Sequence, residues 1–160
     1  MAEIVCNASP LIVLAKSDLL RLLPKLFDAV YVPQAVVTEI EQGPQGDPMR
    51  QLLPETPWLR IVQVEPPLSP LAAWQLGPGE SEVIEYARLH PGLAVVLDDR
   101  AGRRAAQGLG LRLYGTLGVL ALAVKRAAIP SFRAAADSLL KAGLRVAPSI
   151  VDEMDKELRG

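Results

Sequence analysis

Short apolar runs and longer amphipathic runs alternate along this chain. The apolar runs cover residues 4–6, 29–32, 61–64, 93–97 and 111–114. Each has the length of a strand, while most of the segments between them are long enough to contain a helix. Strands that alternate with helices are typical of a parallel sheet whose crossover connections are helical. The pattern therefore predicts an α/β fold, a three-layer α/β/α arrangement with a central parallel sheet.

Helical spacing covers residues 9–16, 18–27, 33–41, 79–89, 99–109, 116–127, 131–142 and 149–158. Ser9 and Pro10 predict the start of the first helix, because Ser is a good N-cap and Pro is favoured at the first helical position. Asp18 is expected to cap the second. Residues 43–57 predict a loop or irregular helix, and the prolines between 66 and 78 predict a stiff connection.

The chain has 160 residues and is half apolar by composition, which suits one well-packed domain. We expect a single domain over residues 1–145 and a tail or helix over residues 146–160 that docks on the domain or on a partner. No signal-peptide core opens the chain, and its longest apolar candidate, residues 117–124, is far below the roughly 20 residues of a membrane span. We expect a cytoplasmic protein with no membrane partner.

The charges are segregated along the chain, although the net charge is only −1. Residues 39–85 hold eight acids and two arginines, whereas residues 100–136 hold seven cations and no acid. The total excludes neither a nucleic-acid partner nor a small-molecule one. Cys6 is the single cysteine and His90 the single histidine. A disulfide and a zinc cage of Cys and His are therefore excluded, and any metal must be held by oxygen.

Two glutamates fall on apolar helical faces. Glu39 shares a face with Val36 and Ile40, and Glu80 occupies the inward side of the first turn of its helix. A carboxylate at such a position is costly unless something pairs with it. The neighbouring acids are expected to be solvated: Glu41, Glu82 and Glu85.

Four polar side chains follow two of the predicted strands. Asn7 and Ser9 follow residues 4–6, and Asp98 and Asp99 follow residues 93–97. In an open parallel sheet, ligands bind just beyond the carboxyl ends of the strands, at a topological switch point. Carboxylates gathered there would repel one another unless a hard cation such as Mg²⁺ or Mn²⁺ neutralised them.

The same acids also have structural interpretations, and residue spacing alone favours these about as much as it favours a metal site. Glu39 could form a buried pair with an arginine, and Glu80 could satisfy the amino end of its own helix. Asp99 could simply cap the helix that it opens.

The ordered set of five segments resembles the PIN-domain superfamily, in particular a prokaryotic branch similar to the toxin ribonucleases of type II toxin–antitoxin systems. The segments are residues 5–16, 32–39, 76–80, 97–103 and 115–120. The resemblance extends over about residues 4–142. It implies a metal-dependent phosphodiesterase site that uses Mg²⁺ or Mn²⁺ and cuts RNA, with a small antitoxin protein and a second copy of the chain as possible partners.

The resemblance also assigns positions. The family's four acidic positions fall on Asn7, Glu39, Glu80 and Asp99, which become the candidate metal ligands, and Asp98 is a candidate to substitute for Asp99 or assist it. Asn7 departs from the aspartate that many members carry, and an amide oxygen brings no charge to the metal.

Four further residues are candidates for substrate binding. Ser9 and Thr116 stand at helix starts, where a hydroxyl could bind a metal-held water or a phosphate, or could serve the helix alone. Arg100 and Arg103 follow Asp99 and could hold the nucleic-acid backbone, or could form a solvated helix face.

Two rival functions remain open at this point. A PIN fold that binds nucleic acid or regulates without cutting is favoured by Asn7. A receiver-like phosphotransfer domain is suggested by the pair Asp98 and Asp99 after a strand, but it leaves Glu39 and Glu80 unexplained.

Overall fold

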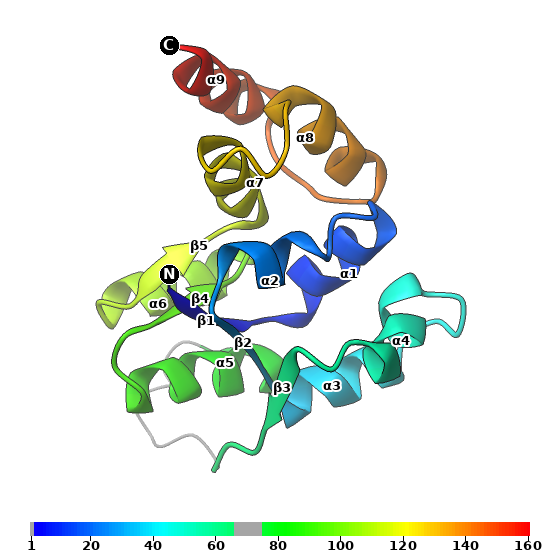
Figure 1. Ribbon diagram of the computed structural model, residues 1–160. Coiled ribbons are helices and arrows are strands. Elements are labelled where there is room, and N and C mark those ends of the chain that lie inside the picture. Colours follow the sequence, from blue (N-terminus) through cyan, green and yellow to red (C-terminus); the bar gives the residue numbers. More distant parts are fainter. Residues whose placement is uncertain (1, 66–74) are drawn as a thin grey trace.

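Five parallel strands form the centre of the molecule, as the computed structural model, which describes residues 2–65 and 75–160, shows (Figure 1). The strands are β1 (Glu3–Cys6), β2 (Ala29–Pro33), β3 (Leu59–Val62), β4 (Leu93–Val96) and β5 (Arg112–Tyr114). Their order across the sheet is β3-β2-β1-β4-β5, and every neighbouring pair is parallel. The predicted parallel sheet is confirmed, and β3 lies at an edge, as expected.

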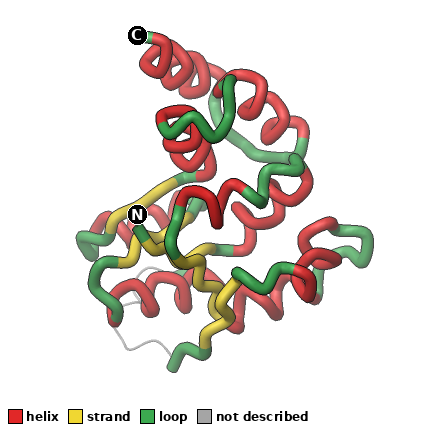
Figure 2. Tube along the Cα trace, viewed as in Figure 1, coloured by secondary structure: helices red, strands yellow, loops and turns green. Residues whose placement is uncertain are grey.

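Helices cover both faces of this sheet, so the three-layer prediction is also confirmed (Figure 2). Before the third strand lie α1 (Ala8–Lys16), α2 (Leu22–Leu26), α3 (Gln34–Glu41), α4 (Pro48–Leu52) and the 3₁₀ turn η1 (Leu53–Glu55). After it come α5 (Pro78–Leu89), α6 (Arg100–Gly108), α7 (Thr116–Lys125), α8 (Phe132–Lys141) and α9 (Pro148–Arg159). In Figure 1, α1 and α2 lie above the sheet, α5 lies below it, and α7, α8 and α9 stack above α1 and α2.

The chain reverses its direction across the sheet between β1 and β4. From β1 it proceeds to β2 and β3 on one side, then returns to β4 and β5 on the other. The Asn7 N–H donates to Val96 O at 3.1 Å, which extends the β1–β4 pairing by one residue. The Leu97 N–H likewise donates to Tyr114 O at 3.0 Å. The segments that start at Asn7 and Leu97 therefore diverge at a switch point, where open α/β sheets bind ligands.

The start of α1 and the segment after it differ from the prediction. The helix begins at Ala8, with Asn7 rather than Ser9 at the N-cap. Asp18 does not cap a helix: its φ of 57° places it in the left-handed region, just past the end of α1. The Leu19 N–H donates to Leu14 O at 2.8 Å, which is the bond that closes a helix carboxyl end in this way. The second helix is consequently shorter than expected.

The last helix packs on the domain through α7 and α8. Val151 is buried, and Asp155 on the same helix is only 8% exposed. Arg133 of α8 reaches Asp155 at 3.5 Å and Asp152 at 2.7 Å. Apolar burial and these ion pairs together hold α9 against its neighbours.

The proline-rich connection predicted between 66 and 78 lies mostly outside the described residues, since it includes residues 66–74. Within residues 2–65 and 75–160, no helix has both the length and the apolar character needed to cross a membrane.

Candidate active site

The carboxyl ends of β1 and β4 open into an acidic cavity of about 240 Å³. Its lining residues are Asn7, Ser9, Glu39, Gly77, Gly79, Glu80 and Asp99. The structure thus brings together all four residues predicted as metal ligands, with Ser9 beside them. They come from the end of β1 and from α3, α5 and the start of α6.

Asn7 holds an unused hydrogen-bond acceptor inside the protein. Its side chain does not cap α1, and one reason is that the third helical residue is Pro10, which has no N–H to donate. Asn7 is only 5% exposed, and its Oδ1 has no hydrogen-bond partner. Across the part of the chain that the structure describes, it is the one buried side-chain oxygen or nitrogen in this condition. Buried polar atoms are almost always paired, so an acceptor without a protein partner at a cavity is available to a water or a bound ion.

Gly79 leaves room beside that oxygen. A Cβ at this position would lie 3.4 Å from Asn7 Oδ1, 3.4 Å from Val36 Cγ2 and 3.9 Å from Glu39 Oε2. Gly102 of α6 has a similar role, because a Cβ at this position would lie 3.3 Å from Glu80 Oε2. The two glycines therefore let α5 and α6 approach the cavity without filling it.

The pKa of Glu80 is raised, first by burial, then by the negative charges of Asp99 and Glu39, and finally by hydrogen bonding to the Asp99 side chain. Glu80 therefore keeps a proton more readily than an ordinary glutamate does. A divalent cation in the cavity would reverse the effect, because it favours the ionised carboxylates.

Asp99 has a structural role as well. Its Oδ2 accepts from the Ala101 N–H at 3.0 Å and the Gly102 N–H at 3.3 Å, so it caps α6. Glu39 is exposed, although Val36 and Ile40 on the same helix are buried. Among the described residues, no arginine forms an ion pair with Glu39. The capping interpretation thus holds for Asp99 and the ion-pair interpretation fails for Glu39.

The donor set fits Mg²⁺ or Mn²⁺ by its chemistry. All the candidate side chains offer oxygen, which these hard cations prefer. No three Asp, Glu, His or Cys side chains in residues 2–65 and 75–160 converge closely enough to hold a metal by themselves. Mg²⁺ commonly keeps several of its waters, and the free Oδ1 of Asn7 would offer one further oxygen.

Asp98 and Thr116, two of the predicted site residues, do not line the acidic cavity. Asp98 Oδ1 accepts from the Thr116 N–H at 2.8 Å, and its Oδ2 accepts from the Thr116 hydroxyl. Thr116 is completely buried. The hydrogen bonds between Asp98 and Thr116 fix the start of α7, so the threonine hydroxyl is not free to bind a phosphate.

Two glutamates expected to be solvated are used inside the fold. Glu82 accepts from the Ala35 N–H at 3.0 Å and satisfies the amino end of α3. Glu85 is 3% exposed and pairs with Arg88, one turn along α5. Their positions were missed because helix periodicity describes one helix at a time, whereas α5 also packs against α3 and the sheet.

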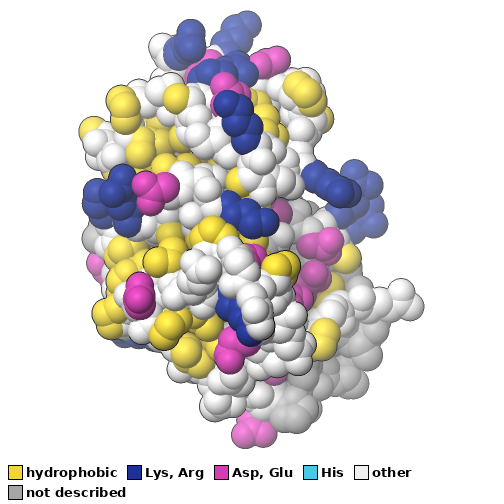
Figure 3. All heavy atoms as spheres, turned by 90° about the vertical axis from the view of Figure 1, so that its right-hand side faces the viewer, with side chains coloured by type: hydrophobic (Ala, Val, Ile, Leu, Met, Phe, Trp, Pro, Cys, Tyr) yellow, Lys and Arg dark blue, Asp and Glu magenta, His cyan; other side chains and the backbone are white. Residues whose placement is uncertain are grey.

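A larger groove of about 1100 Å³ adjoins the acidic cavity, and Ser9 and Asp99 line both. Arg100, Arg103 and Arg104 lie along one side of it. The Arg103 Nη1 donates to Leu97 O at 3.3 Å, which holds this side chain near the end of β4. In Figure 3, Lys and Arg side chains gather next to Asp and Glu side chains near the right-hand edge of the molecule.

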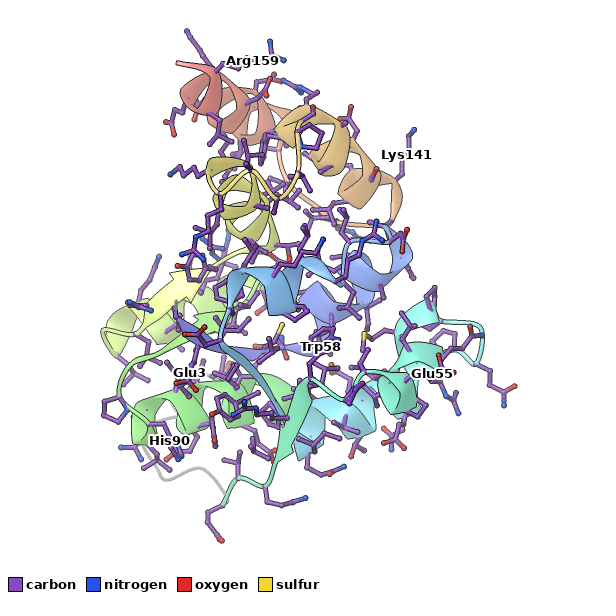
Figure 4. All side chains as sticks on the ribbon, in the orientation of Figure 1. Glu3, Glu55, Trp58, His90, Lys141 and Arg159 are labelled. Carbon is purple, nitrogen blue, oxygen red and sulfur yellow. The ribbon has the colours of Figure 1, made fainter. Side chains whose placement is uncertain are left out.

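His90 and Trp58 do not line the acidic cavity. His90 stands at the end of α5, where its Nδ1 lies 2.9 Å from Tyr86 O and its ring stacks on that tyrosine (Figure 4). Trp58 packs against the core just before β3. The prediction for Trp74, a packing or interface residue, lies outside the described residues.

Comparison with known proteins gives one positive result. A family model described as PIN domain (DUF3368) matches residues 3–159. No curated protein and no solved structure matches the chain.

Proposed function

We propose that this chain, which belongs to the PIN-domain family, is a metal-dependent endoribonuclease that hydrolyses RNA phosphodiester bonds, in the manner of a toxin ribonuclease. PIN domains are generally nucleases and generally use divalent metal ions. The finer proposal on this chain is carried by one observation. A buried and unpartnered Asn7 Oδ1 faces a cavity that also gathers three carboxylates.

Asn7, Glu39, Glu80 and Asp99 would hold Mg²⁺ or Mn²⁺ there. A bound divalent cation supplies a water of lowered pKa and neutralises charge on the leaving oxygen. A bound cation would favour the ionised form of Glu80, whose pKa is raised first by burial and then by the charges of Asp99 and Glu39. The cap that Asp99 forms on α6 keeps its carboxylate oriented.

Arg100 and Arg103 stand next to this centre on the first turns of α6. Their guanidinium groups would position the phosphate backbone against the ligands, which is the usual role of arginine on nucleic acid. Ser9 lines the acidic cavity and the groove, and its exposed side chain is available to a phosphate or a water at their junction.

The test is cleavage of a labelled RNA panel in Mg²⁺, Mn²⁺ or EDTA by the purified chain and by Asp99→Asn and Glu39→Gln. Asp99→Asn keeps an oxygen for the helix cap while removing the charge. Loss of even an outer partner of a metal site typically lowers activity roughly 10–100-fold, so loss of a ligand charge should lower it at least that much. Glu41→Gln is the matched control, since Glu41 is exposed on α3 and does not line the cavity.

Cleavage that persists in EDTA, or that Asp99→Asn leaves intact, would contradict the proposal. The second candidate function, an RNA-binding or regulatory PIN fold without catalysis, is favoured by the neutral side chain at Asn7. It would appear as RNA binding without cutting in either metal. The antitoxin partner and the homodimer rest on sequence resemblance and stay predictions.

A further inference from the structure

The groove beside the acidic cavity has a second wall that the proposed chemistry does not use. It is built by the segment after α8 and by the first turns of α9: Leu144, Arg145, Val146, Ala147, Ile150 and Met154. The arginine side of α6 forms the facing wall. At about 1100 Å³ the groove is larger than most small-molecule pockets, which run to roughly 1,000 Å³.

Backbone geometry explains why this wall presents one cation. Gly143 has a φ of 113° and ends α8, and the Leu144 N–H then donates to Leu139 O at 3.0 Å. Leu144 is buried at 9% exposure, so the next residue, Arg145, is exposed at the groove.

The cations of the groove are not paired within the protein. Over the described residues, Arg100, Arg104 and Arg145 take part in no ion pair, and all three are exposed. Cations collected along one groove repel one another and attract a partner with a row of negative charges. Asp99, at the end of this row, is shared with the acidic cavity, so the row leads toward the proposed metal site.

The second wall also carries an apolar shelf, formed by Val146, Ile150 and Met154. Ile150 is 46% exposed, which is unusual for a large apolar side chain in this structure. Ile150 and Met154 are four residues apart and share a helical face, whereas Val151 supplies the face that packs on α7 and α8. Val146 and Met154 also pack partly against the core, whereas Ile150 does not, so Ile150 is the part of the shelf that is left free for a ligand.

Cations on both walls, with an apolar shelf on the second, match the two parts of a single nucleic-acid strand, its phosphates and its unstacked bases. We propose that this groove holds the unpaired nucleotides next to the scissile phosphate, with phosphates on Arg100, Arg104 and Arg145 and a base on Ile150 and Met154. The inference deepens the proposed function and rests on it. A duplex is excluded as the preferred substrate, because its bases are stacked and paired and cannot reach the shelf.

The test measures binding separately from cutting. Fluorescence anisotropy in EDTA gives the affinity for a labelled 12-nucleotide RNA, alone or annealed to its complement, across a range of salt concentrations. Arg145→Ala should weaken single-strand binding about fivefold and reduce the salt slope by about 0.7, the share of one phosphate contact. Ile150→Ser should weaken it about threefold with an unchanged slope, since a base contact releases no counterions.

Lys141→Ala is the matched control. Lys141 is an exposed cation at the end of α8, its side chain points away from the body of the molecule (Figure 4), and it does not line the groove. Equal affinity for single strand and duplex, no RNA binding at all, or unchanged affinity in both groove variants would overturn the inference. An acidic helical peptide that binds where RNA does not would assign the groove to a protein instead.

Failure of the groove and failure of the nuclease give different results. If only the groove assignment is wrong, Arg145→Ala and Ile150→Ser bind and cut as the wild type does, while Asp99→Asn is inactive. If only the nuclease proposal is wrong, nothing cuts, yet the groove variants still weaken single-strand binding. Thermal unfolding of both variants confirms that neither result reflects loss of the fold.

Discussion

Two adjacent carboxylates, Asp98 and Asp99, have opposite surroundings. Asp98 has both oxygens bonded to Thr116, one to its N–H at 2.8 Å and one to its hydroxyl. Asp99 is exposed, uses one oxygen to cap α6, and lies within reach of Glu80 and Glu39. Two adjacent residues thus belong to different clusters. Asp98 and Thr116 are hydrogen-bonded to each other, whereas the carboxylates around Asp99 repel one another.

The comparison distinguishes residues that stabilise the fold from residues that are available to bind a ligand. Satisfied polar groups such as Asp98 and Thr116 stabilise the native state. An acceptor without a partner, such as Asn7 Oδ1, and carboxylates that raise the pKa of Glu80 reduce its stability. A cation that binds the second cluster should restore this loss, and each substitution below tests one side of the comparison.

The largest effect is expected at Glu80. The folded protein holds the Glu80 proton more tightly than the unfolded chain does, so wild-type stability without metal falls as the pH rises from 4.5, the ordinary pKa of a glutamate, through the raised pKa. Glu80→Gln removes that loss, so in EDTA the variant should be more stable than the wild type at pH 7.5 and similar to it at pH 4. Urea denaturation measures both.

Metal should reverse the order of the two proteins. Mg²⁺ at 100 times its Kd stabilises a one-site protein by about 2.7 kcal/mol, and Glu80→Gln should lose most of this gain. Glu41→Gln, on the exposed side of α3, should retain it. A Glu80→Gln variant that responds to Mg²⁺ as the wild type does would remove Glu80 from the ligand set.

The next effect concerns the hydrogen bonds between Asp98 and Thr116. Asp98→Ala leaves the Thr116 N–H and hydroxyl without their acceptor at the start of α7, and should lower the free energy of unfolding by about 2 kcal/mol. Stabilisation by Mg²⁺ should remain. Thr116→Val, which keeps the N–H bond, should lower it by about 1 kcal/mol. If Asp98→Ala folds normally but is no longer stabilised by Mg²⁺, then Asp98 belongs to the metal site and its contrast with Asp99 is wrong.

The last effect is expected at Asn7. Asn7→Asp adds a negative charge at the free acceptor, so Mg²⁺ should bind about tenfold more tightly by calorimetry, a gain of about 1.4 kcal/mol. The same variant should be less stable than the wild type in EDTA, because the added charge is buried beside carboxylates. Unchanged Mg²⁺ affinity would mean that the chain has abandoned the site, and would favour the binding-module function.

Local pattern was sufficient for the strands and for most helices, since short apolar runs and capping residues act over a few neighbouring positions. Asp99 at the start of α6 and Ser131 at the start of α8 cap as such residues are expected to. At Asp18 the local pattern gave the wrong prediction. A helix ends just before it, and only the backbone conformation separates an N-cap aspartate from one in the left-handed region.

The sequence by itself determined the α/β class, the order of the strands along the chain, the oxygen-only choice of candidate ligands and the four candidate ligands that line the acidic cavity. Only the tertiary structure decided that Asp98 serves α7, that Asn7 Oδ1 lacks a partner, and that Arg145, Ile150 and Arg100 line one groove. The physical reason is distance along the chain. Helix and strand preferences act between near neighbours, whereas hydrogen-bond satisfaction and the composition of a groove depend on elements that meet only after folding.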